Sequence, residues 1–181
     1  TGGWEATIAN TLSPGDKVLA CRHGVFSDKW IRMCEAFGLV VDVIECDWRG
    51  PADPALIEAA LLADQNHAIK AVLATHNETA TGVRSDLKAI RESIDRAEHN
   101  ALFFVDGVSS IASMDFQMDA WGVDAAVTGS QKGFMMPAGL AIVAVSEKAI
   151  DAGKTATLPR FFFDFKQMGQ MTHQGGFPYT P

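Results

Sequence analysis

Short apolar runs rich in β-branched residues alternate along this chain with longer stretches whose apolar residues recur every three or four positions. The short runs have the length and composition of buried strands, and the longer stretches have the periodicity of amphipathic helices. The predicted strands are residues 17–21, 39–46, 70–75, 101–105, 125–128 and 140–145, and the predicted helices are residues 4–11, 26–37, 54–63 and 85–99. This alternation is typical of an α/β protein with a mostly parallel sheet and helices on both faces.

The size of the chain suits one domain with a substantial core, because it has 181 residues of which 48% are hydrophobic. It opens on Thr1 rather than on a methionine, and we therefore interpret it as a segment of a longer polypeptide. After Ser146 the alternation decays, and the aromatic cluster at residues 161–165 is expected to leave the sheet towards a second domain or a partner subunit.

The net charge of −7 disfavours nucleic acid and anionic membranes as partners, because both select for clustered lysine and arginine. The apolar runs are too short to span a bilayer. The three cysteines, Cys21, Cys34 and Cys46, lack the spacing of metal ligands and suit reduced thiols. We therefore expect a cytoplasmic protein with no metal site.

Two residues of opposite charge follow predicted strands: Asp106 after residues 101–105 and Lys132 after residues 125–128. Ligands bind at the carboxyl ends of parallel strands, so both side chains are candidates for one pocket. A partly desolvated lysine can form a Schiff base with a carbonyl compound, and a carboxylate can keep a pyridine nitrogen protonated. Taken singly, Lys132 could instead be a solvated loop residue and Asp106 a turn or helix cap.

Two further segments can supply polar contacts to the same edge of the sheet. Thr1-Gly2-Gly3 precedes a predicted helix, whose free amides and dipole could meet an anion such as a phosphate. On local grounds it could equally be a flexible chain end. The segment 75–82, Thr-His-Asn-Glu-Thr-Ala-Thr-Gly, brings hydroxyls and an amide after another strand. We expect His76 within it to be a pocket wall or a structural residue rather than a metal ligand.

The segment 75–82, the run Phe-Val-Asp-Gly-Val-Ser-Ser at 104–110 and Gly-Ser-Gln-Lys-Gly at 129–133 occur in an order and spacing that resemble the class V aminotransferases of pyridoxal phosphate fold type I. The resemblance is greatest to the glyoxylate aminotransferases that use serine, alanine or aspartate as amino donor, and it extends over nearly the whole chain. It implies pyridoxal 5′-phosphate as cofactor and transfer of an amino group to glyoxylate, which gives glycine and a 2-oxo acid.

The resemblance also implies a role for each matching residue. Lys132 would hold the cofactor aldehyde and move the substrate's α-proton, and Asp106 would pair with the pyridinium nitrogen. The remaining implied cofactor contacts are Val108 and Phe26 on the two ring faces, Thr79 on the ring hydroxyl, Thr1, Gly2 and Gln131 on the phosphate, and Thr180, with Phe177 or Tyr179, at the cofactor of a neighbouring subunit. For Phe26, a place in the helix core is a strong alternative.

The implied organisation is a homodimer or higher homo-oligomer. Residues 1–160 would form the central part of the cofactor-binding large domain, and residues 161–181 a connecting and subunit-contact segment towards a C-terminal small domain. The arginine that binds the substrate carboxylate in this family lies in that small domain, outside the chain, so the donor amino acid is not fixed by this sequence and the segment alone is expected to be inactive.

Two other functions stay open from the sequence. Cysteine desulfurases share the fold and cofactor, but they usually have a histidine immediately before the lysine, where this chain has Gln131. The second is a noncatalytic α/β segment that serves dimerisation or ligand binding.

Overall fold

A six-stranded, mostly parallel sheet forms the centre of the molecule, with strand order β2-β1-β3-β6-β7-β8. The computed structural model describes residues 1–176. The strands are β1 (Lys17–Arg22), β2 (Val40–Glu45), β3 (Ile69–Thr75), β6 (Leu102–Asp106), β7 (Ala125–Gly129) and β8 (Ala141–Val145). The first five pair in parallel, whereas β8 runs antiparallel to β7 at one edge of the sheet.

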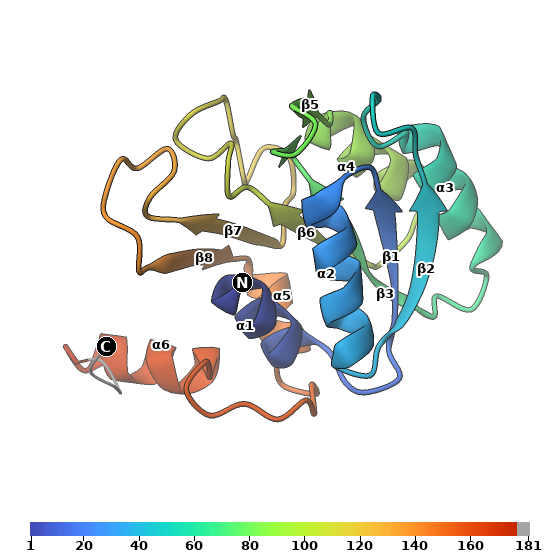
Figure 1. Cartoon of the computed structure of the whole chain (residues 1–181). Coiled ribbons are helices and arrows are strands. Elements are labelled where there is room, and N and C mark those ends of the chain that lie inside the picture. Colours follow the sequence, from blue (N-terminus) through green and yellow to red (C-terminus); the bar gives the residue numbers. More distant parts are fainter. Residues whose placement is uncertain (177–181) are drawn as a thin grey trace.

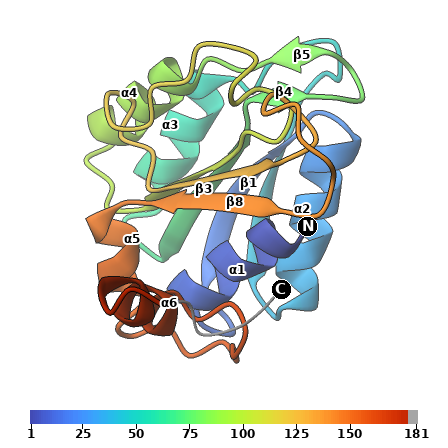
Figure 2. The same ribbon diagram turned by 90° about the vertical axis from the view of Figure 1, so that its left-hand side faces the viewer.

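Helices cover both faces of this sheet, as the alternating pattern predicts. Figures 1 and 2 show α1 (Gly2–Thr11), α2 (Val25–Ala36) and α5 (Glu147–Ala152) on one face, and α3 (Pro54–Ala63) and α4 (Leu87–Arg96) on the other. Each face has its own core: Trp4, Ile8 and Trp30 pack on one side of the strands, and Ile57, Leu61 and Ile90 on the other. The strands between them therefore read as continuous apolar runs.

The helix boundaries follow from local capping. The Asp53 side chain accepts a hydrogen bond from the Ala55 amide at the start of α3, where Pro54 occupies the first turn. Asp86 caps α4 in the same way through the Ala89 amide. Helix α2 differs, because its N-cap is Gly24 and no side chain at that position caps it.

Some elements differ from the sequence-based expectation. A short hairpin, β4 (Asn77–Glu78) with β5 (Val83–Arg84), follows β3 in a region for which the sequence pattern predicts no strand. Beyond α5, the chain forms α6 (Phe165–His173), which has no buried residue and lies apart from the sheet in Figure 1. The decay of periodicity after Ser146 correctly predicts that this region leaves the sheet, but it does not reveal the short helix.

Candidate active site

One pocket gathers most of the sequence-predicted residues at the carboxyl ends of the parallel strands. Its volume is about 450 Å³. The residues that line it are Thr1, Trp4, Phe26, Lys29, Met33, Thr79, Asp106, Val108, Gln131 and Lys132. They come from α1, α2 and the connections that follow β3, β6 and β7, which is the place where parallel sheets bind ligands.

Asp106 is the last residue of β6 and is 4% exposed. Its Oδ1 accepts a hydrogen bond of 2.9 Å from the Val108 amide, the one side-chain hydrogen bond of Asp106 within residues 1–176. Burial raises the pKa of Asp106 to about 6, and the negative charge of Glu78 adds to this rise, while the Val108 amide opposes it. A buried carboxylate with so little compensation favours a cationic ligand beside it.

Lys132 lies in a tight turn directly after β7. The Lys132 amide donates to the Gly129 carbonyl, and the Lys132 carbonyl accepts from the Met135 amide. A Cβ on Gly133 would lie 2.2 Å from the Ile111 carbonyl oxygen, so only glycine lets this turn press against the connection that follows β6. The sequence analysis considers a partly desolvated lysine at this position. In the structure the Lys132 side chain is instead exposed to the pocket. Its amine is therefore accessible to a ligand.

The N-terminus of α1 forms a third side of the pocket. Thr1 is the N-cap residue, but its side chain makes no capping hydrogen bond, and the first intrahelical amide donor is Glu5, which bonds the Thr1 carbonyl. The amides of the first turn are therefore available to an anion. Gly2 belongs to this turn but does not line the pocket, and a Cβ there would lie 3.4 Å from the Phe163 ring. The flexible-end alternative is wrong for this segment, because Gly2 begins a regular helix.

Gln131 approaches the pocket beside Lys132. A Cβ on Gly129 would lie 2.9 Å from the Gln131 Oε1 atom, so the glycine gives the Gln131 amide room to fold back over the end of β7. Gln131 and the first turn of α1 thus supply neutral hydrogen-bond donors to the same pocket.

The apolar walls come from separate elements. Phe26 lies in the first turn of α2 and is half-buried, and Val108 follows Asp106 and is half-buried as well. Thr79 follows β4 and exposes its side chain to the pocket. The core-only alternative for Phe26 is incomplete, because its ring packs against the core and also lines the pocket.

Sequence reasoning misses three residues that line the pocket: Trp4, Lys29 and Met33. Lys29 and Met33 lie three and seven positions after Phe26 on α2, a helical spacing that could have placed them on the same face. The Lys29 Nζ atom lies 5.3 Å from the centroid of the Phe26 ring. A second amine therefore lines the pocket, which the reasoning about strand ends does not anticipate.

His76 is a structural residue, as expected. Its Nδ1 atom lies 2.9 Å from the Ser110 Oγ atom, and its ring packs on Phe116 and Trp121. Within residues 1–176, there is no group of three or more histidine, cysteine, aspartate or glutamate side chains that could hold a metal ion. The described helices also include none long and apolar enough to cross a membrane. Thr180, Phe177 and Tyr179 lie outside the described residues.

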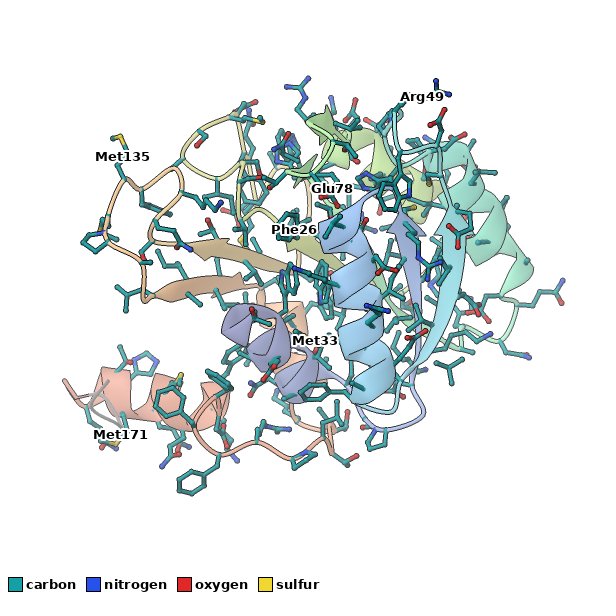
Figure 3. All side chains as sticks on the ribbon, in the orientation of Figure 1. Phe26, Met33, Arg49, Glu78, Met135 and Met171 are labelled. Carbon is teal, nitrogen blue, oxygen red and sulfur yellow. The ribbon has the colours of Figure 1, made fainter. Side chains whose placement is uncertain are left out.

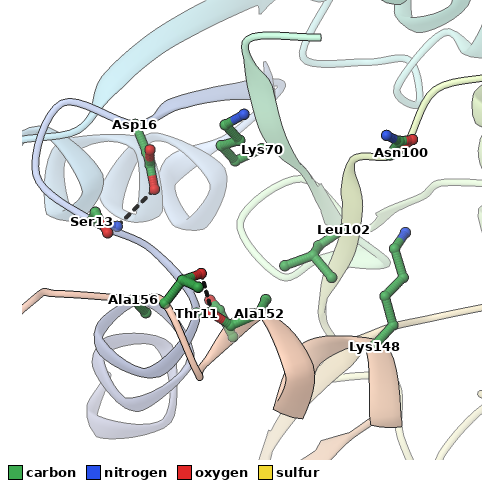
Figure 4. Close-up of a pocket in the computed structure, with 10 residues that line it drawn as sticks. Thr11, Ser13, Asp16, Lys70, Asn100, Leu102, Lys148, Ala152 and Ala156 are labelled. Atoms are coloured by element: carbon green, nitrogen blue, oxygen red, sulfur yellow. Dashed lines mark hydrogen bonds between the residues drawn. The ribbon is translucent and has the colours of Figure 1, made fainter.

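A second hollow, of about 350 Å³, lies at the opposite end of the strands and contains none of the predicted site residues (Figure 4). Its charged groups are bonded to their surroundings: Asp16 accepts from the Ser13 amide at 2.7 Å, and the Lys148 Nζ atom donates to the Ala101 carbonyl at 2.9 Å.

Comparison with known proteins agrees with this geometry. Residues 5–176 match the family model described as aminotransferase class-V. The whole chain aligns with 46% of the length of the L-aspartate–glyoxylate aminotransferase of Paracoccus denitrificans, at 60% sequence identity. It also aligns with 45% of the length of the serine–glyoxylate aminotransferase of Hyphomicrobium methylovorum, at 53% identity. Among solved structures, an aspartate aminotransferase of subgroup IV from Thermus thermophilus superimposes with a TM-score of 0.86 at 29% identity, over 99% of this chain and 49% of that one. The chain thus spans about half the length of the curated relatives it matches.

Proposed function

The chain belongs to the class-V aminotransferase family, and on that premise we propose that the protein transfers an amino group from serine, aspartate or alanine to glyoxylate. The products are glycine and the 2-oxo acid of the donor. The observation that carries this proposal is the convergence of Asp106, Lys132 and the N-terminus of α1 on one pocket.

Pyridoxal phosphate is the cofactor of this family, and the residues of the pocket fit it. The nearly unpaired carboxylate of Asp106 suits a cationic ring nitrogen, and the exposed amine of Lys132 suits an aldehyde. The first turn of α1, with Thr1 and Gly2, and the Gln131 amide would hold the phosphate. Phe26 and Val108 would cover the two ring faces, and Thr79 would bond the ring hydroxyl.

The bound cofactor supplies an electron-accepting ring that stabilises negative charge at the substrate α-carbon. Lys132 takes the α-proton with its Nζ atom and returns a proton in the second half of the reaction. Asp106 keeps a proton on the ring nitrogen by pairing with it, and its buried position makes this charge pairing strong. The donor would leave as its 2-oxo acid with an oxygen from water, and glyoxylate would take up the amino group, held meanwhile by the cofactor, and leave as glycine with release of one water.

The test is a transamination assay on the full-length protein with glyoxylate and each donor in turn. We expect glycine to form with at least one donor, and Lys132→Ala to abolish its formation. Borohydride should fix the cofactor to the peptide that contains Lys132, and still do so in Lys29→Ala, which removes the other amine of the pocket. Attachment at another lysine would contradict the assignment, and sulfur release from cysteine without glycine formation would favour a desulfurase.

The same proposal includes the organisation of the protein. Residues 1–160 would be the central part of the cofactor-binding domain, and residues 161–181 the connection to a small domain and to a second subunit, whose cofactor Thr180 would reach. The exposure of Phe161 (77%) and Phe162 (45%) supports a covering surface in a homodimer or higher homo-oligomer. The free thiols of Cys21, Cys34 and Cys46 support a cytoplasmic location.

A further inference from the structure

The fully buried carboxylate of Glu78 lies between the β4–β5 hairpin and the start of α2. Glu78 is not among the residues that line the pocket. Its side chain is 0% exposed. The Glu78 Oε2 atom accepts hydrogen bonds from the Phe26 amide at 3.0 Å, the Ser27 amide at 2.9 Å and the Ser27 hydroxyl at 3.2 Å. The Oε1 atom accepts from the Ala80 amide at 3.1 Å. The carboxylate therefore joins two segments that are far apart in the sequence.

The start of α2 is shaped to receive this carboxylate. Helix α2 has no capping side chain at its N-cap, Gly24. A Cβ on Gly24 would lie 2.2 Å from the Glu78 Cγ atom, so a serine or aspartate cap could not coexist with Glu78. A negative charge at a helix N-terminus is stabilised by the free amides and by the helix dipole. Glu78 thus replaces the local cap of α2 with a cap from a distant element.

The hydrogen bonds of Glu78 hold two segments that form walls of the pocket. Glu78 immediately precedes Thr79 and holds the amide of Ala80, so the backbone on either side of Thr79 is fixed. It also holds the amide of Phe26, and Figure 3 shows Glu78 and Phe26 together at the first turn of α2. Thr79 and Phe26 both line the pocket.

The hairpin is also tied to the wall that carries Asp106 and Val108. The Asn77 Nδ2 atom donates to the Ser109 hydroxyl at 2.9 Å, and that hydroxyl donates to the Asn77 carbonyl at 2.9 Å. Thr79 therefore lies on a segment that is held from both sides, by α2 through Glu78 and by the connection after β6 through Ser109.

We propose that Glu78 is a positioning residue of the cofactor pocket, which sets the Thr79 hydroxyl and the Phe26 ring in place before the cofactor binds. This inference rests on the proposed function, because it takes pyridoxal phosphate as the ligand of the pocket. A pocket wall that is already ordered costs less conformational entropy on binding, so affinity is gained without a contact from Glu78 itself.

The first test measures the affinity of the cofactor-free, full-length protein for pyridoxamine phosphate by calorimetry. Glu78→Gln keeps the size of the side chain but removes the charge and turns an amide towards backbone donors. We expect affinity to fall roughly 10- to 100-fold, as for the loss of hydrogen bonds to a charged group. The control is Asp86→Ala, which removes the side-chain cap of α4 away from the pocket and should lower thermal stability while leaving affinity unchanged.

The second test is a double-mutant cycle that separates positioning from a general loss of stability. Thr79→Val removes the hydroxyl that Glu78 is proposed to position, so Glu78→Gln should lose much less affinity in that background than in the wild type. Equal losses in both backgrounds would overturn the positioning of the Thr79 hydroxyl, and unchanged affinity in Glu78→Gln would overturn the whole proposal. If Glu78→Gln does not fold, Glu78→Asp, which keeps the charge but withdraws it by one methylene, replaces it in the same cycle. A wild-type protein that binds no pyridoxamine phosphate would contradict the proposed function instead.

Discussion

Asp106 is suited to bind a cationic ligand, but its buried charge lowers the folding stability of the protein without that ligand. Burial raises the pKa of this carboxyl from 3.8 to about 6 in the absence of a ligand. Between these values the unfolded chain ionises Asp106 while the folded protein keeps it protonated, so stability falls as the pH rises from about 4 to about 6. Above that window the buried charge costs about 3 kcal/mol of folding free energy.

A first prediction follows for the cofactor-free, full-length protein. Asp106→Asn keeps an oxygen for the Val108 amide but carries no charge, so it should be more stable than the wild type by roughly 1–3 kcal/mol at pH 8. The difference should shrink as the pH falls from about 6 to about 4, and it should disappear only below the ordinary carboxyl pKa of 3.8. Urea denaturation of both proteins at several pH values measures this, and a difference that does not vary with pH would show that the buried Asp106 charge is not its cause.

A second prediction concerns the loaded enzyme. With a cationic ring nitrogen beside it, the Asp106 charge is paired, and Asp106→Asn should retain the cofactor but slow proton abstraction from the donor by on the order of 100-fold or more. Single-turnover measurements with deuterated and ordinary donor isolate this step. Wild-type rates with an unchanged isotope effect would remove Asp106 from the chemistry.

Asp106 and Lys132 are predictable from the sequence because each lies at or just after the end of a recognisable strand, and parallel strands share one edge. The role of Glu78 is not predictable in this way, since the amides it binds lie on α2, 51 residues away at Ser27. Lys29 is not predictable from the ends of strands either, because it reaches the pocket from a helix. Sequence patterns thus identify residues whose position follows from local structure, and miss those that depend on packing between distant elements.

At the level of elements, the close packing of α1 on the sheet fixes the site proposed for phosphate. A Cβ on Gly3 would lie 2.6 Å from the Val127 Cγ1 atom of β7 and 3.2 Å from the Val143 Cγ2 atom of β8. The pair Gly2-Gly3, which the sequence marks only as a candidate anion site or a flexible end, therefore includes a residue required for helix–sheet contact. The alternation pattern predicts α1 and β7 individually, but it does not give the distance between them.

A third prediction compares two helical glycines. Gly3→Ala should destabilise the protein by about 1–2 kcal/mol, because strain against Val127 exceeds the gain in helix propensity. The matched control is Gly169→Ala on α6, where a Cβ would meet no atom within 4 Å. That variant should be neutral or stabilised by up to about 1 kcal/mol. Thermal unfolding of both variants gives the comparison, and equal effects would show that α1 can move away from the sheet without cost.

On the scale of the whole molecule, the phenylalanines at residues 161–163 differ in their exposure. Phe161 and Phe162 are exposed, whereas Phe163 is half-buried and its ring approaches Gly2 at the start of α1. The expected contact of this segment with a partner stays a prediction for the two exposed residues, whereas Phe163 packs on the protomer itself. The segment that carries them is thus in direct contact with the helix proposed to bind the phosphate.

This contact couples the proposed assembly to cofactor binding, and the last prediction tests the coupling. Phe161→Asp places a charge on the exposed apolar surface, so it should shift sedimentation of the full-length protein from dimer to monomer and weaken cofactor retention in parallel. Gln170→Asp, an exposed change nine residues along on α6, controls for the added negative charge. Thr180→Ala should leave the dimer intact yet lower cofactor affinity by roughly 1.5–3 kcal/mol, the value of one charge-assisted hydrogen bond. A Phe161→Asp monomer that retains its cofactor as firmly as the wild type would separate assembly from binding and remove the second subunit from the site.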